Sequence, residues 1–361
     1  MDRRAFTKLS ALTLAAVRSS WAFQGASRTG PVGFAVVGLG AISDIFMRAC
    51  AASQKAKVVA LVTGHPMEKG RRYAGMHAVP ESGIYTYESF DRLRDNPAVE
   101  AVYIGLPNSM HREYTERAAA AGKHVLCEKP MAISSAECRS MIAACDAARV
   151  KLMIAYRIQY EPLWYQAWKM IRGGDIGQVQ SFQGGFFNQT KAGEWRLSRT
   201  LGGGGSVLDL GIYPLNSIRW ITGEEPVDFS AVVSTRDHSG RFAEVEQSVE
   251  WTMRFPSRII ASCASSYGQT GPGFLNINGD AGYLQMQPGY FYDGLRMSGM
   301  VAGKKVEITS DGRNPYQFTL EADHFADCIR LDQTPRTTGE EGLKDLLAIE
   351  AIYKAAGTPI A

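Results

Sequence analysis

Residues 34–43 read Phe34-Ala35-Val36-Val37-Gly38-Leu39-Gly40-Ala41-Ile42-Ser43, and much of the architecture can be predicted from this segment. A continuous apolar run predicts a strand buried on both faces, and the glycines after it permit a tight turn into a helix. Such a turn lets the backbone approach a pyrophosphate at the positive end of that helix. Ser43 stands where the pattern usually has a third glycine or alanine. The motif alone is therefore weak, because other tight strand-to-helix turns can produce it.

Its context strengthens the motif, because further short apolar runs alternate with helical patterns along the chain. These runs are Val58–Val62, Ala101–Gly105, His124–Cys127 and Leu152–Ala155. Parallel strands that helices cover on both faces have this appearance. We therefore predict a doubly wound parallel sheet, a Rossmann domain, over residues 32–156.

The pattern changes beyond Tyr156. A helical stretch at Glu161–Arg172 precedes longer alternating segments at Val179–Phe187, Val245–Phe255, Ile259–Tyr267 and Tyr283–Gln287. Alternation suits a large, open, mainly antiparallel sheet with one covered face. Two more helical patterns follow, at Leu320–Arg330 and Glu340–Ala356. We predict a substrate-binding and oligomerisation domain of α+β class over residues 157–361, and a homodimer or homotetramer that covers the open face of the sheet.

Composition agrees with two ordinary globular domains. Of its 361 residues, 45% are hydrophobic and 21% are charged, and the net charge is +3. At about 150 residues per domain, this length predicts two domains. So small a net charge gives no case for a nucleic-acid or membrane-surface partner. The six cysteines lie scattered without metal-ligand spacing, so we predict buried free thiols and no metal site.

Residues 1–26 have the pattern of a twin-arginine signal peptide. Arg3-Arg4-Ala5-Phe6-Thr7-Lys8 precedes the apolar run Leu9–Val17 and the small-x-small triplet Ser20-Trp21-Ala22. The apolar run is about half of what a membrane-spanning helix needs. We therefore expect export by the twin-arginine machinery to the periplasm, with no membrane association afterwards. An uncleaved cytoplasmic protein is the alternative.

The end of the second predicted strand favours NADP over NAD. An NAD site usually has an acidic residue there for the ribose 2′-hydroxyl, but this chain reads Val62-Thr63-Gly64-His65-Pro66. Lys69 and Arg72 follow closely, and with the Thr63 hydroxyl they could bind a 2′-phosphate. The alternative is that these cations form an ordinary solvated helix face.

Three residues further along have chemistry suited to a catalytic site. Lys129 follows the strand at His124–Cys127, at the sheet edge where parallel sheets bind ligands. Asp209 and Tyr213 are four residues apart at the start of a predicted helix over Val207–Ile221, so their side chains would project toward a common point. The alternatives are a surface lysine before a proline turn, and a helix cap beside a core aromatic residue.

Several motifs in order resemble the signatures of the Gfo/Idh/MocA oxidoreductase family. They are Gly38–Ser43, Leu106–His111, Ala121–Ala132 and Ala155–Pro162. Trp195–Leu197 and Gly202–Tyr213 most resemble the glucose–fructose oxidoreductase branch. The similarity extends from about residue 33 to the C-terminus.

The resemblance implies roles for individual residues. Lys129, Asp209 and Tyr213 match the catalytic positions, and Tyr213 is expected to be the base, with the Lys129 ammonium beside it. With Arg157 and Tyr292 they would also bind the substrate. The remaining expected cofactor contacts are Gly38, Gly40, Ala41, Ile42, Thr63, Gly64, His65, Lys69, Arg72, Leu106, Pro107, Asn108, His111, Glu128, Lys129, Arg157, Trp195 and Arg196.

The implied activity is oxidation of an aldopyranose such as glucose at C1 to its lactone, with the hydride passed to a ketose or aldose acceptor. The alternatives are an aldose 1-dehydrogenase that releases NADPH, a NAD-dependent glycosidase of the same fold, and a non-catalytic sensor. Only Phe23–Pro31 stand where the branch has a long proline-rich arm, so permanent retention of NADP stays open.

Overall fold

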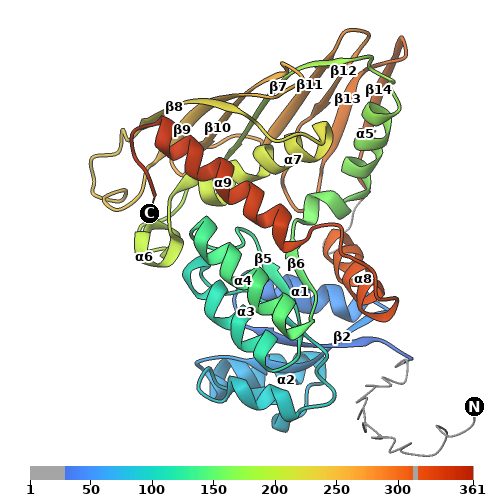
Figure 1. The fold of residues 1–361 in the computed structure, drawn as a ribbon, viewed down its shortest axis with the longest axis vertical. Helices are drawn as coiled ribbons and strands as arrows, with labels where there is room; N and C mark the ends of the chain where they lie inside the picture. Colours follow the sequence, from blue (N-terminus) through green and yellow to red (C-terminus); the bar gives the residue numbers. More distant parts are fainter. Residues whose placement is uncertain (1–28, 312–315, 361) are drawn as a thin grey trace, which may run out of the picture.

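A computed structural model describes residues 29–311 and 316–360, so the predicted signal segment lies outside the described residues. Two sheets, each with its own helices, follow one another along the long axis of the molecule (Figure 1). The N-terminal half of the chain forms the smaller sheet, and the C-terminal half forms the larger one.

The N-terminal sheet is parallel throughout and has the order β3-β2-β1-β4-β5-β6. Its strands are β1 (Val32–Val37), β2 (Ala56–Val62), β3 (Ile84–Tyr85), β4 (Ala101–Ile104), β5 (His124–Glu128) and β6 (Leu152–Ala155). The helices that follow them are α1 (Ala41–Ala52), α2 (Arg71–His77), α3 (His111–Ala120) and α4 (Ser135–Ala148). Every residue of β1, β4 and β6 is buried, as the apolar runs predicted. The predicted doubly wound sheet is confirmed.

The strand order reverses beside β1, which lies between β2 and β4. Helices leave opposite faces of the sheet at such a point, so a crevice opens outside the carboxyl ends of the strands. The glycine turn after β1 and the loops after β4 and β5 all lie at this edge.

The C-terminal sheet has eight strands in the order β14-β13-β12-β11-β7-β10-β9-β8. They are β7 (Val179–Phe187), β8 (Asp228–Ser234), β9 (Ser248–Arg254), β10 (Ile260–Ser266), β11 (Phe274–Gly279), β12 (Tyr283–Met286), β13 (Arg296–Val301) and β14 (Lys304–Thr309). Only β7 and β10 pair in parallel, so the predicted mainly antiparallel sheet is confirmed. The predicted segments did not include β8, β11, β13 or β14, each of which is only six or seven residues long.

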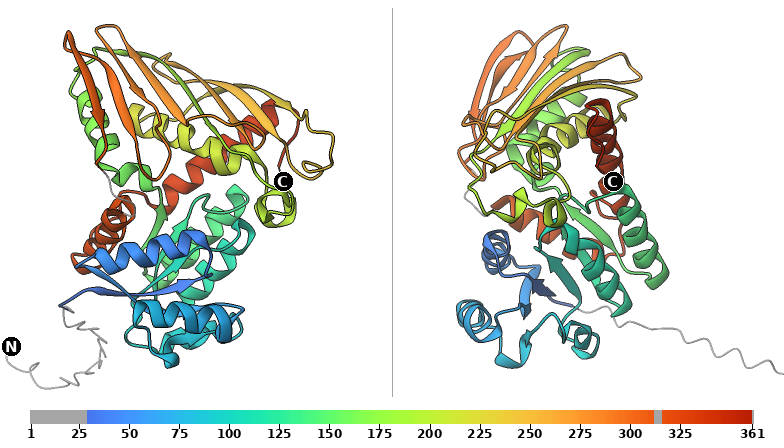
Figure 2. Two further views of the ribbon diagram at one scale, coloured as in Figure 1. Left: turned by 180° about the vertical axis from the view of Figure 1, so that it is seen from behind. Right: turned by 90° about the vertical axis from the view of Figure 1, so that its left-hand side faces the viewer.

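Helices cover one face of the large sheet and leave the other open. They are α5 (Pro162–Arg172), α7 (Ile212–Thr222) and α9 (Gly339–Ala355), which lie between the two sheets (Figures 1 and 2). A short helix, α6 (Arg199–Gly202), reaches from the large sheet toward the N-terminal domain. On the open face, Val232 is 70% and Ile260 52% exposed.

One late helix completes the first domain. Helix α8 (Tyr316–Arg330) packs against α1, and Ala322 and Phe325 share its apolar core. The Thr319 hydroxyl also donates to the Ala49 carbonyl at 3.2 Å. The C-terminal part of the chain therefore contributes to the wall of the N-terminal domain.

All six cysteines are buried and none is in a disulfide. In residues 29–311 and 316–360, no helix is both long and apolar enough to cross a membrane. No group of three or more His, Cys, Asp or Glu in this part of the chain could hold a metal ion.

Candidate active site

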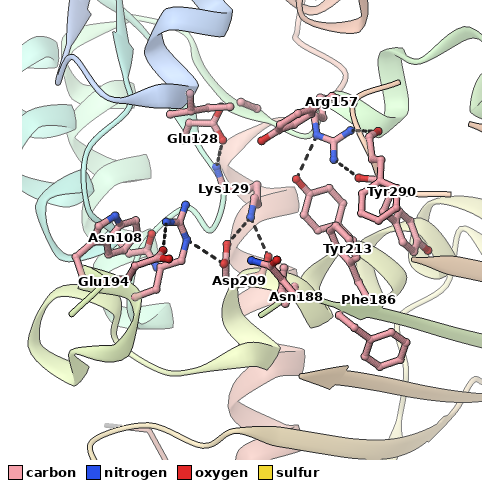
Figure 3. A pocket seen from close by; sticks show the side chains of 18 of the residues that line it. Asn108, Glu128, Lys129, Arg157, Phe186, Asn188, Glu194, Asp209, Tyr213 and Tyr290 are labelled. Atoms are coloured by element: carbon pink, nitrogen blue, oxygen red, sulfur yellow. Dashed lines mark hydrogen bonds and ion pairs between the residues drawn. The ribbon is translucent and has the colours of Figure 1, made fainter. Parts of the chain in front are cut away.

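A cavity of about 360 Å³ lies between the two sheets, at the carboxyl ends of β4, β5 and β6 (Figure 3). Its volume is in the usual range for small-molecule sites. Eleven predicted site residues line it: Ile42, Leu106, Asn108, Glu128, Lys129, Arg157, Trp195, Arg196, Asp209, Tyr213 and Tyr292. The structure therefore brings together residues that lie up to 250 positions apart in the sequence.

The glycine turn after β1 has the geometry that a pyrophosphate needs. Gly38 has a φ of +81°, and a Cβ there would lie 2.7 Å from the Gly105 carbonyl oxygen. Gly40 precedes α1, and no atom lies within 4 Å of the place that its Cβ would take. No side chain caps α1, so the amides of Ala41 and its neighbours are available to a ligand. These residues fit a dinucleotide.

The residues after β2 that were expected to contact the cofactor also lie at the carboxyl edge of the N-terminal sheet. Thr63 is only 2% exposed, and its hydroxyl oxygen accepts from the His65 amide at 3.1 Å. Thr63 therefore shapes the turn, and its contact with a phosphate stays a prediction. Gly64, His65 and Arg72 are exposed, and Lys69 is partly exposed.

The loop after β4 carries three more of the residues expected to contact the cofactor. His111 is completely buried, and its ring nitrogens lie 2.9 Å from the carbonyl oxygens of Leu106 and Pro130. It joins the loops after β4 and β5 and does not line the cavity. Asn108 does line the cavity, but its amide donates to the Gly202 carbonyl at 2.9 Å. The neighbouring Pro107 is partly buried and lies outside the cavity lining.

Lys129 and Asp209 form an ion pair in the floor of the cavity (Figure 3). Lys129 Nζ lies 2.9 Å from Asp209 Oδ1 and donates to the Asp209 carbonyl at 2.8 Å. The other carboxylate oxygen accepts from Arg196 Nε at 3.0 Å and from the Tyr267 hydroxyl at 3.2 Å. Asp209 is therefore fixed by four contacts from three separate segments.

These contacts set the charges of the pair. Burial alone would raise the pKa of Asp209, but the nearby Lys129 and Arg196 cations outweigh it and lower the pKa to about 2. For Lys129, burial lowers the pKa, but the Asp209 and Tyr213 charges outweigh it and the pKa is raised. Lys129 is therefore an ammonium group at neutral pH, and not a lysine whose pKa burial has lowered.

Tyr213 lies on the other side of Lys129. Residues Val207–Gly211 form a π-helical turn ahead of α7, where the sequence predicted one regular helix. Lys129 Nζ sits over the Tyr213 ring, 4.8 Å from its centroid, and Arg157 Nε donates to the Tyr213 hydroxyl at 3.2 Å. Asp209 and Tyr213 thus face a common point, which Lys129 occupies.

Glu128 and Arg157 complete the polar part of the cavity. Glu128 accepts from the Tyr103 hydroxyl at 2.7 Å, and burial raises the pKa of its carboxyl. Arg157 is 5% exposed and is held by the Tyr290 and Phe291 carbonyls. It follows β6, so it reaches the cavity from the neighbouring strand.

The cavity has an aromatic wall that motif reasoning mostly missed. Phe186, Phe187 and Phe291 line it, together with Tyr290. Phe186 comes from the end of β7, and Phe318 from the start of α8. No short motif marks these positions. The available signal was that Phe186 stands near the carboxyl end of the predicted strand Val179–Phe187, where a side chain can reach a cavity.

The chain belongs to the Gfo/Idh/MocA family of oxidoreductases. Residues 32–156 match the model for the oxidoreductase family with a NAD-binding Rossmann fold, and residues 164–285 match the GFO/IDH/MocA C-terminal domain. The two matches together cover more than half of the chain.

Several relatives are named for activity on sugars. A D-xylose 1-dehydrogenase [NADP(+)] of Haloarcula marismortui is 32% identical over 97% of this chain and 98% of its own length. The crystal structure of aldose-aldose oxidoreductase from Caulobacter crescentus, complexed with glycerol, has a TM-score of 0.87 and 42% identity; the match covers 91% of this chain and 98% of that one. A levoglucosan dehydrogenase in complex with NADH and levoglucosan shares the fold, with a TM-score of 0.80 and 21% identity; the match covers 91% of this chain and 97% of that one.

Proposed function

We propose that the protein is an NADP-dependent sugar oxidoreductase that oxidises an aldopyranose at C1 to its lactone and passes the hydride to a ketose or aldose acceptor. The observation that carries this proposal is the convergence of Lys129, Asp209 and Tyr213 in one cavity at the switch point of the dinucleotide fold. The 42% identity to an aldose-aldose oxidoreductase supports the two-sugar cycle.

The chain's own residues supply proton transfer and positioning. NADP supplies the hydride acceptor when it is bound beside α1. The Tyr213 phenolate oxygen takes the proton of the anomeric hydroxyl as the hydride leaves C1. The Lys129 ammonium, fixed by Asp209, stabilises the negative charge that develops on the sugar oxygen.

The ion pairs of Lys129 and Arg196 favour an uncharged sugar beside them. Lys129 is paired with Asp209, while Arg196 is paired with Asp209 at 3.0 Å and with Glu194 at 3.7 Å. A phosphate or carboxylate on the substrate would therefore have to displace existing ion pairs. The aromatic wall suits the apolar face of a pyranose ring.

A second candidate is a simple aldose 1-dehydrogenase that releases NADPH in each cycle. The D-xylose 1-dehydrogenase [NADP(+)] of Haloarcula marismortui supports it, because that relative matches nearly the full length of the chain. The two candidates use the same site and differ in whether the reduced cofactor leaves.

The test is the absorbance and fluorescence of purified protein, first with no cofactor added, then after D-glucose, then after D-fructose. The proposed cycle predicts a reduced-nicotinamide signal that appears with glucose and disappears with fructose. Steady release of NADPH only after NADP is supplied would favour the second candidate. No signal with glucose or xylose under either condition would contradict both.

We also propose that the twin arginines direct export to the periplasm. Replacing Arg3 and Arg4 by lysine should leave the protein in the cytoplasmic fraction of the host, because the export machinery reads this pair. Periplasmic recovery of the double variant at the wild-type level would contradict this proposal.

A further inference from the structure

Arg157 is a buried cation whose contacts are unusual for its charge. Its Nη1 donates to Gln317 Oε1 at 2.9 Å and to the Phe291 carbonyl at 3.3 Å, and its Nη2 donates to the Tyr290 carbonyl at 2.5 Å. Its Nε donates to the Tyr213 hydroxyl at 3.2 Å. All four acceptors are uncharged, and Arg157 makes no ion pair with any carboxylate in the described part of the chain.

Such an arrangement leaves a positive charge without a counter-ion. An arginine side chain stays protonated in proteins, and burying its charge without a partner is costly. The carboxyls of Glu128 and Glu321 are nearby, but burial raises the pKa of both. Glu321 is completely buried, and neither of its oxygens has a hydrogen-bond partner in the described residues. Both carboxyls are thereby biased toward their neutral forms and balance the guanidinium charge poorly.

In the described residues, Lys129 makes no hydrogen bond to the Tyr213 hydroxyl. Its ammonium lies over the ring face, 4.8 Å from the centroid, and donates its hydrogen bonds to Asp209. The cation that contacts the Tyr213 oxygen is Arg157, whose guanidinium carbon also lies 4.8 Å from the ring centroid. Tyr292 lies on the other side of Arg157, with its ring centroid 4.7 Å away.

We propose that Arg157 is the positioning residue that stabilises the Tyr213 phenolate, and that Gln317 holds Arg157 in place for this purpose. A negative charge on the Tyr213 oxygen would be the missing counter-ion. A hydrogen bond from a charged donor is stronger when the acceptor is also charged, so the contact favours the phenolate over the phenol. The inference rests on the proposed role of Tyr213 as the base.

Gln317 connects this contact to the second domain and to the aromatic wall. It is 4% exposed and lies in the first turn of α8, and its Nε2 donates to the Tyr292 carbonyl at 2.8 Å. One side chain amide therefore fixes both the guanidinium group and the loop that carries Tyr290 and Tyr292. Its own amide is neutral, so it orients Arg157 without cancelling the charge.

The first test is a spectroscopic titration of tyrosinate in the purified protein, with Tyr213→Phe as the reference that removes the Tyr213 signal. In Gln317→Leu the Tyr213 phenolate should form about one pH unit or more above its wild-type midpoint, because the charged contact is loosened. In Gln317→Glu the Tyr213 phenolate should form at a still higher pH, because the new carboxylate competes with it as the counter-ion for Arg157.

Gln159→Leu is the matched control. Gln159 is 4% exposed and its amide donates to Asn216, and in the described residues its side chain makes no hydrogen bond to Tyr213 or Arg157. This variant should leave the Tyr213 titration at the wild-type midpoint. Gln317→Leu and Gln317→Glu that titrate like Gln159→Leu would overturn the inference.

Kinetics give a second, separate result. With D-glucose and NADP, kcat at pH 7 should fall roughly tenfold or more in Gln317→Leu, and its low-pH limb should shift upward with the titration. KM for NADP should change little, since Gln317 does not lie at the dinucleotide turn. A wild-type protein that oxidises no sugar would contradict the proposed function, while the tyrosinate titration would still decide the role of Arg157. A lower kcat with an unmoved pH limb would overturn the inference.

Discussion

Asp209 is the residue on which the polar contacts of the cavity converge. Lys129 and Arg196 contact its two carboxylate oxygens from opposite domains, and Tyr267 adds a third donor. The sequence predicts Asp209 as a catalytic residue together with Lys129 and Tyr213. Because its oxygens are already engaged by protein donors, its main effect in this structure is to hold the two cations.

The lowered pKa of Asp209 makes a prediction about stability. Its pKa is about 2 in the fold and 3.8 in the reference state, so its stabilisation is complete above the reference value and is lost as the pH falls toward 2. Asp209→Asn should lower the free energy of unfolding by about 2 kcal/mol at pH 5 and by about 1 kcal/mol at pH 3. Urea denaturation at both pH values checks this.

The control for this prediction is Asp95→Asn, because Asp95 is exposed. It should change the free energy of unfolding by less than about 0.5 kcal/mol at both pH values. A loss in Asp209→Asn that stays constant or grows between pH 5 and pH 3 would contradict the account.

At the scale of single elements, the turn from β1 into α1 is the most demanding piece of backbone at the cofactor edge. Gly38 combines a positive φ with close contact to the loop after β4. Gly38→Ala should cost about 1–3 kcal/mol of stability, because the left-handed backbone and the crowding are both unfavourable. It should also weaken NADP binding; urea denaturation measures the loss of stability, and isothermal titration calorimetry measures the affinity for NADP.

Gly75→Ala provides the contrast within the same domain. Gly75 lies inside α2, and nothing is within 4 Å of its Cβ position. Alanine should therefore stabilise the protein by about 0.5–1 kcal/mol. Equal effects of the two substitutions on stability and on NADP binding would refute the role assigned to the turn.

The segment after β2 predicts cofactor choice. Lys69→Ala combined with Arg72→Ala should raise KM for NADP by about tenfold or more and leave KM for NAD nearly unchanged, because only NADP carries the 2′-phosphate. Arg71→Ala is the control, since Arg71 is exposed and paired with Glu81 at 2.9 Å. The same rise in KM for both cofactors would argue against this site.

At the scale of the whole molecule, one face of the eight-stranded sheet carries no helix (Figures 1 and 2). We propose that a second copy of the chain covers it. Val232 in β8 and Ile260 in β10 are apolar and exposed on this face. Such residues on a broad sheet favour a partner over water.

This proposal predicts a homodimer or homotetramer by size-exclusion chromatography with light scattering. Val232→Arg combined with Ile260→Arg should shift the assembly to monomers, because two charges would be buried in the interface. The circular dichroism spectrum should not change, since both side chains lie at the surface. A monomeric wild-type protein at micromolar concentration would contradict the proposal.

Much of the molecule could be predicted from sequence because its signals are local. The buried parallel strands, the glycine turn, and the motifs that carry Lys129, Asp209 and Tyr213 are each short and contiguous. Strands β8, β11, β13 and β14 were not predicted, because each is only six or seven residues long and its alternation is correspondingly weak. Contacts such as Arg157 with Gln317 join residues 160 positions apart. No local pattern encodes such a contact, so only the folded chain reveals it.

The buried positions of Thr63 and His111 illustrate the same limit. Both residue types suit a cofactor site, and both lie in loops at the correct sheet edge. Their side chains turn inward and satisfy the backbone of the loops themselves. The direction of a polar side chain depends on which backbone groups lack partners, and those are set by the tertiary structure.

The central claim is that hydride leaves C1 of an aldopyranose in the cavity that Lys129, Asp209 and Tyr213 share. The most direct test uses D-glucose deuterated at C1, with mass spectrometry of the nicotinamide cofactor and of the reduced acceptor. The account predicts that deuterium appears on the cofactor and, with fructose present, on the alditol, and that Tyr213→Phe and Lys129→Met greatly slow its transfer. Deuterium that stays on the sugar, or transfer that proceeds at wild-type rates in both variants, would contradict the account.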